Sequence, residues 1–114
     1  MQDYQVERRK FLEAQLVFKA GEKPEAGALA ISILLSMFYI LPASRYFASE
    51  PEKAQAFVDE CDGLRGEIFR YKNTKSPPQS GNYYSYPEFL ELDNKYDALV
   101  RKFYHILMLT GFSP

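Results

Sequence analysis

The chain has 114 residues, 46% of them hydrophobic and 25% charged, which fits one packed domain over residues 1–114 and excludes a disordered chain. Lys and Arg number 14 against 15 Asp and Glu, so the formal net charge of −1 gives no indication of a polyanionic partner for the whole molecule. The single cysteine, Cys61, excludes a disulfide framework and a cysteine-rich zinc site within the chain.

The first two expected elements are helices over about 3–20 and 24–41. Apolar residues recur at helical spacing in both, and strand-like alternation is nearly absent from the chain. The apolar side of the first helix consists of Tyr4, Phe11, Leu12, Leu16 and Phe18. Gly21 then occupies the position where a glycine commonly ends a helix. Pro24 suits the first turn of the second helix, and Pro42 ends or kinks it.

Residues 28–41 of the second helix are apolar on every side apart from Ser32 and Ser36, whereas a bundle helix needs one apolar stripe. Three coverings are open: a membrane, the rest of this chain, or a second protein. At about 1.5 Å per residue the segment spans roughly 21 Å, short of the about 30 Å of a bilayer core, which disfavours the membrane. Ala28, Ser32 and Ser36 fall four residues apart, so one face is small enough for another helix to pack closely.

The third and fourth helices are expected over about 50–72 and 86–110. Both follow the same phrase, a serine two residues before a proline and three before a glutamate, at residues 49–52 and 85–88. This phrase predicts a capping box, in which the serine and glutamate side chains each bond the backbone amide of the other residue.

Four helices joined mostly by short links predict an all-α fold, most simply an antiparallel four-helix bundle. Gly63 and Gly66 indicate either the close approach of a neighbouring helix or a bend. If the third and fourth helices pair around the loop between them, Cys61 faces about Asp97, and His105 lies further along the fourth helix.

The carboxyl ends of the second and fourth helices carry more apolar side chains than one core stripe requires. In an up-down-up-down bundle these two helices run in the same direction, so the two ends meet. Apolar patches beyond a few hundred Å² usually mark interaction sites. The residues expected to bind a partner there are Met37, Tyr39, Ile40, Leu41, Ile106, Met108 and Phe112.

The stretch 70–89 combines basic residues and tyrosines with the chain-breaking sequence Ser-Pro-Pro-Gln-Ser-Gly. It is a connector whose tyrosines fold back over the helix ends, a contact for another protein, or a contact for a nucleotide or nucleic acid. In the last case cations bind phosphate and aromatic rings stack on bases. The candidate residues are Tyr83, Tyr84 and Tyr86 for the protein contact, and Arg70, Lys72 and Lys75 for the nucleotide contact.

No residues with an established catalytic or cofactor-binding spacing occur in the sequence. His105 is the only histidine, so a histidine-rich metal site cannot form within one chain. In the predicted alignment, Cys61 and His105 lie about 12 Å apart along the bundle, beyond the about 3 Å reach of a hydrogen bond. We therefore expect Cys61 in the core, no cofactor or metal, and no enzymatic activity.

The sequence favours a small non-enzymatic interaction protein of the inhibitor, immunity, adaptor, regulator or chaperone type, acting through an apolar helix face and the tyrosine-rich loop. The expected partner is another protein or a second copy, in a homo-oligomer. The alternative is a helical bundle that binds a nucleotide or other anion through loop 70–86. A nucleic acid ranks below a protein as partner, and a membrane ranks lower still. No basic-then-apolar leader follows Met1, so the expected location is cytoplasmic.

Overall fold

The computed structural model describes residues 4–79 and 81–111, and this part of the chain is helical with no strand. The helices are α1 (Tyr4–Lys19), α2 (Pro24–Phe38), α3 (Arg45–Ser49), α4 (Pro51–Thr74), the 3₁₀ helix η1 (Tyr83–Ser85) and α5 (Pro87–Leu109). The predicted all-α fold class is confirmed. Each long helix begins and ends within three residues of its expected bounds.

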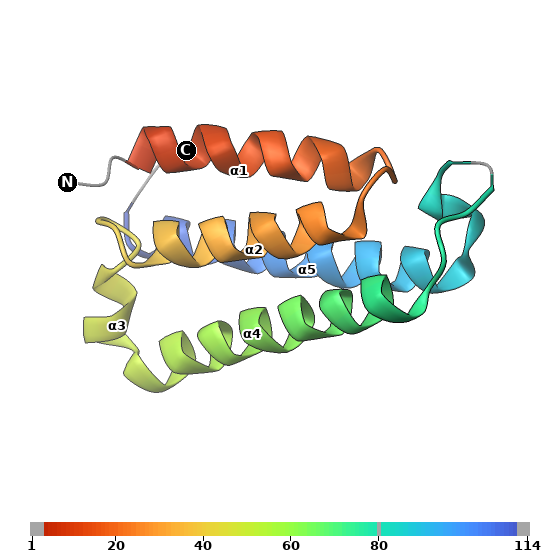
Figure 1. The fold of residues 1–114 in the computed structure, drawn as a ribbon. Helices are drawn as coiled ribbons and strands as arrows, with labels where there is room; N and C mark the ends of the chain where they lie inside the picture. The colour runs from red at the N-terminus through yellow and green to blue at the C-terminus, as the bar shows by residue number, and fades with distance from the viewer. Residues whose placement is uncertain (1–3, 80, 112–114) are drawn as a thin grey trace.

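The four long helices lie side by side, with α3 at one end of the bundle and η1 at the other (Figure 1). α1 and α4 run from the α3 end to the η1 end, and α2 and α5 run back (Figure 1). α2 lies between α1 and α4 and packs on both. The bundle measures 47 × 27 × 21 Å.

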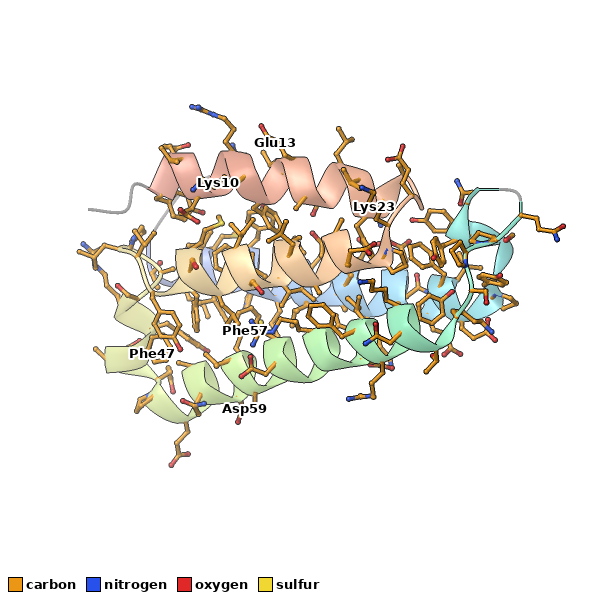
Figure 2. All side chains as sticks on the ribbon, in the orientation of Figure 1. Lys10, Glu13, Lys23, Phe47, Phe57 and Asp59 are labelled. Atoms are coloured by element: carbon orange, nitrogen blue, oxygen red, sulfur yellow. The ribbon has the colours of Figure 1, made fainter. Side chains whose placement is uncertain are left out.

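The short helix α3 was not indicated by the sequence, because five residues are too few to show a periodic pattern. It covers the end of the core with Tyr46, which is buried, and Phe47, whose ring lies 4.9 Å from the Phe38 ring centre. Aromatic contacts continue inward from there, with Phe57 of α4 5.0 Å from Phe38. Figure 2 shows Phe57 on the side of α4 that faces the bundle.

α1 turns a narrower side inward than predicted. Tyr4, Phe11 and Phe18 are buried as expected, whereas Leu12 and Leu16 are 37% and 72% exposed. At 100° per residue, Leu16 lies about 140° around the helix from Phe11, too far to share its buried side.

Neither predicted capping box forms. Glu50 and Tyr86 occupy the N-cap positions of α4 and α5, and neither makes a side-chain capping hydrogen bond. Ser49 is instead the last residue of α3, and Ser85 is the last of η1, where its hydroxyl donates to the Asn82 carbonyl at 3.0 Å. Because the two short helices include these serines, each serine lies one residue before the N-cap position of the following helix and does not cap it.

α4 and α5 pair about one turn away from the predicted alignment. Lys102 Nζ lies 2.7 Å from Glu60 Oε1, and Lys95 Nζ lies 2.7 Å from Glu67 Oε1. Cys61 therefore faces a position about four residues beyond the predicted one. α4 continues further than expected, and η1 lies in the connection between α4 and α5. The point at which the chain reverses direction therefore lies closer to the C-terminus than predicted.

Candidate functional site

α2 is covered mainly by the chain itself, which was one of the three open possibilities. Most of its residues are buried, with α1 and α4 packed on two sides. The side of α2 that carries small residues contacts α4 at Ser32, whose Oγ accepts a hydrogen bond from Arg65 Nη1 at 3.0 Å. Within residues 4–79 and 81–111, no helix combines the length and the apolar character needed to span a membrane.

One side of α2 nevertheless stays open to solvent. Leu29 is 56% exposed, and Ile33 and Ser36 are partly exposed. These residues are spaced by four and three positions, so they share one side of the helix. The open side therefore carries two large aliphatic residues and no charge.

A groove of about 660 Å³ runs between α1 and α2 on this open side. Its apolar lining consists of Ala14, Val17, Ala26, Leu29 and Ile33. Its charged lining, Glu7, Lys10 and Glu13, comes from α1 alone, and Figure 2 labels the last two on that helix. Glu7 is buried and pairs with Lys10, whose Nζ lies 3.5 Å from its carboxylate. The groove thus has apolar walls and a charged rim on one side.

The carboxyl ends of α2 and α5 lie at the same end of the bundle, as predicted (Figure 1). Tyr39, Leu41 and Met108 are each more than half exposed there, and Ile40 is partly buried against the core. Leu109, which was not among the predicted contact residues, is 60% exposed. The sequence indicated Leu109 through the apolar run that ends α5. We call Tyr39, Ile40, Leu41, Met108 and Leu109 the apolar end.

The surface position expected for Met37 and Ile106 is wrong. Met37 is fully buried, and Ile106 is 3% exposed. Each lies on the inward side of its helix beside other buried residues, Phe38 and Leu107, which are also fully buried. Part of the apolar surplus at the ends of α2 and α5 therefore belongs to the core and not to the surface. Phe112 lies outside the described residues.

The tyrosines of the loop between α4 and α5 fold back over the helix ends, as the first of the three interpretations proposed. Tyr83 is buried, with its ring centre 5.9 Å from that of Phe89. Tyr84 meets Phe89 edge-on at 4.8 Å. The Tyr86 hydroxyl donates to the Ser76 carbonyl at 3.0 Å. These three rings belong to the packed structure rather than to an open surface.

The loop is also bonded to the turn between α1 and α2, which sequence reasoning missed. Tyr83 N donates to the Gly21 carbonyl at 2.9 Å, and Asn82 Nδ2 donates to the Ala20 carbonyl at 3.0 Å. Asn82 Oδ1 accepts from Tyr84 N at 2.8 Å. Gly21 has φ 72°, a conformation that favours glycine, and a Cβ there would collide with Asn82. The glycine was the only signal in the sequence for this contact.

Two of the three candidate phosphate-binding cations are already paired. Lys72 Nζ lies 3.5 Å from Glu25, and Lys75 Nζ lies 3.3 Å from Glu88. Arg70 is exposed and forms no ion pair within the described part of the chain. The structure therefore gathers these cations near the loop but leaves only one without a carboxylate.

Lys19 joins α1 to α5 through two carboxylates. Its Nζ lies 2.6 Å from Asp93 and 2.9 Å from Asp97. Burial lowers the pKa of Lys19, but the hydrogen bonds that Lys19 donates to the two aspartates outweigh this effect, so the pKa is raised above its usual value. The lysine offsets one of the two negative charges and binds both carboxylates, so this cluster links α1 to α5 and its cation position is taken by Lys19.

Cys61 is a core residue, as expected. Burial, followed by the charges of Asp62 and Glu60, raises the pKa of its thiol to about 12. The thiolate that nucleophilic chemistry requires is therefore strongly disfavoured at neutral pH. His105 is exposed on α5. In the described residues, no group of three or more His, Cys, Asp or Glu side chains is placed to hold a metal ion.

Comparison with protein-family models finds no match to this chain, and comparisons with curated proteins and with solved structures also find none. The surfaces of the fold that bear on its function are the α1–α2 groove, the apolar end and the loop cations.

Proposed function

We propose that the chain is a small interaction protein without catalytic activity, which binds another protein or a second copy of itself through the open side of α1 and α2. The observation that carries the proposal is the α1–α2 groove, whose apolar lining includes Leu29 and Ile33 of α2, the most apolar of the four long helices that the structure describes. Removing apolar surface from water contributes about 25 cal/mol per Å², so filling this groove with a partner is favourable.

The apolar end supplies a second contact surface in this proposal, through the exposed Tyr39, Leu41 and Met108. The loop tyrosines are left out because Tyr83 is buried, and Tyr84 and Tyr86 are partly buried against the core. Inhibitor, immunity, adaptor, regulator and chaperone proteins can all act by binding alone. A cytoplasmic location is part of the proposal and agrees with a single cysteine that is free and buried.

Leu29→Glu tests the proposal because it places a carboxylate on the groove wall at a half-exposed position. Leu16→Glu is the matched control, since Leu16 is exposed on α1 and does not line the groove. The unchanged chain and both variants are cross-linked in cell extract, each captured protein is purified, and its affinity is measured by calorimetry. We expect Leu29→Glu to lose binding and Leu16→Glu to keep it. Equal affinity for all three chains would contradict the proposal.

A nucleotide or other anion is the second candidate ligand. The observation that favours this candidate is Arg70, which is exposed and has no ion pair within the described residues. The carboxylate partners of Lys72 and Lys75 count against it. A thermal-shift series with nucleotides and short nucleic acids, at low and high salt, tests this candidate. A rise in melting temperature at low salt that Arg70→Gln removes would support it, and no rise with any ligand would rule it out.

A further inference from the structure

Four residues of α1 form an exposed stripe with the spacing of a coiled coil. Val6, Lys10, Glu13 and Val17 follow one another at steps of four, three and four, the steps at which coiled-coil helices meet. All four are at least partly exposed, and the last three line the α1–α2 groove. This spacing keeps one side of a helix toward a partner helix for about three turns.

α2 carries a second stripe with the same steps. Leu29, Ile33, Ser36 and Ile40 are all at least partly exposed, and Ile40 lies just beyond the end of the helix. Leu29 and Ile33 line the same groove as the α1 stripe. Both stripes therefore open on one side of the molecule and can meet one partner surface together.

The charges on the α1 stripe are complementary to those of a second copy that runs in the opposite direction. In that arrangement Lys10 of one copy meets Glu13 of the other, twice, and Val6 meets Val17. A parallel copy would place Lys10 on Lys10 and Glu13 on Glu13, which repels. The stripe thus distinguishes an antiparallel copy from a parallel one.

The α2 stripe is also complementary to the same stripe of an antiparallel second copy. Leu29 meets Ile40 of the antiparallel copy, and Ile33 meets Ser36, a large residue against a small one. The midpoint of this stripe lies between residues 34 and 35, and that of the α1 stripe lies between 11 and 12. Phe18 and Gly27 face each other across the antiparallel helices, so the two midpoints lie at the same level within about 2 Å. A single two-fold axis can pass beside both.

We infer that the partner in the α1–α2 groove is a second copy of this chain, packed antiparallel and face to face across a two-fold axis that relates Lys10 to Glu13 of the other copy. The inference rests on the proposed function and names its partner.

Covering the two stripes leaves neither serine hydroxyl of α2 without a partner. The Ser36 hydroxyl donates to the Ser32 carbonyl at 3.4 Å, and the Ser32 hydroxyl donates to the Ala28 carbonyl at 3.1 Å. On α1, Glu13 has no ion pair in the part of the chain that the structure describes, and the Lys10 side chain is 59% exposed. The dimer gives Glu13 an ion-pair partner and gives Lys10 a second one beside Glu7.

Sedimentation velocity on the full chain over a range of concentrations tests the inference, and we expect a dimer. Lys10→Glu and Glu13→Lys each place like charges opposite one another at two symmetric points, so each variant alone should dimerise at least about tenfold more weakly. Mixed one to one, the two variants restore both opposite-charge contacts. The mixture should therefore dimerise within about threefold of the unchanged chain.

Leu29→Glu places two carboxylates in the apolar contact and should weaken the dimer more than about 100-fold, while Leu16→Glu should leave it unchanged. Helical circular dichroism equal to that of the unchanged chain shows that each variant is folded. An unchanged chain that stays monomeric at about 1 mM overturns the inference. The proposed function survives that result if Leu29→Glu still loses a purified partner protein. A mixture of the charge variants no tighter than either alone overturns the antiparallel arrangement.

Discussion

Phe18 lies so close to Gly27 that a Cβ on Gly27 would come within 2.5 Å of the phenyl ring. The ring has little room to move, because Phe18 is fully buried and packs on Phe89 and Tyr96 at centre distances of 5.2 and 4.9 Å. The absence of a side chain at Gly27 therefore lets α1 and α2 approach closely at this end of the groove between them.

Gly27→Ala should destabilise the protein by about 1–3 kcal/mol through overpacking, even though alanine is the better helix former. Urea unfolding followed by circular dichroism measures the change. Gly63→Ala in α4 is the control, because a Cβ there would meet nothing within 4 Å and should stabilise the helix by up to about 1 kcal/mol. The prediction fails if both substitutions change stability in the same direction.

Tyr71→Phe should stabilise the protein by about 1 kcal/mol. Its hydroxyl is buried and, among the described residues, has no hydrogen-bond partner, so its removal relieves a desolvation cost. Tyr96→Phe is the comparison, since the Tyr96 hydroxyl donates to Gln15 Oε1 at 2.8 Å and its loss should cost about 1 kcal/mol. The free energies of unfolding of the two variants should thus differ from that of the unchanged chain with opposite signs.

Stability should fall as pH rises from about 10 to about 12. Burial raises the pKa of Tyr4 and Tyr71 to about 12 and also raises that of Tyr96, from a usual value of 10.0. In this window the unfolded chain has lost protons that the folded chain keeps, so the free energy of unfolding decreases with pH. Chemical denaturation at pH 9 to 12 measures the slope, which Tyr71→Phe should make shallower. A flat profile would contradict the assignment.

Cys61 should be unreactive in the folded protein at pH 8. The residue is fully buried, and burial raises the pKa of its thiol to about 12, so both access and thiolate are lacking. A chromogenic disulfide reagent should react at least about 100-fold faster in denaturant than in buffer. Rapid labelling of the native protein, with circular dichroism unchanged, would show that Cys61 is accessible.

Asn82→Ala should release the loop between α4 and α5 from the α1–α2 turn. It removes hydrogen bonds to the Ala20 carbonyl and from Tyr84 N, and should cost about 1–2 kcal/mol. Hydrogen exchange at the Tyr83 amide, which donates to Gly21, should become faster. Gln79→Ala, in an exposed part of the same loop, is the control and should change neither quantity.

Local sequence signals predicted the long helices because helix formation depends on residues three and four positions apart. Pro24 and Gly21 mark the turn between α1 and α2 closely. Ser49 and Ser85 do not cap as predicted, since α3 and η1 are too short to show a period and include the residues expected to cap the next helix. The observed α4–α5 alignment also differs by one turn from the predicted one.

The sequence by itself determined an all-α chain of four long helices, with Cys61 on a buried stripe and more apolar surface on α2 than one stripe needs. Only the tertiary structure decided where that surplus goes: Met37 and Ile106 turn inward, while Leu29 remains open beside α1. Periodicity shows which residues share a side of a helix, but burial depends on how far neighbouring helices reach around it. Contacts between helices, such as Phe18 with Gly27 and Glu67 with Lys95, determine how far each neighbour covers a helix.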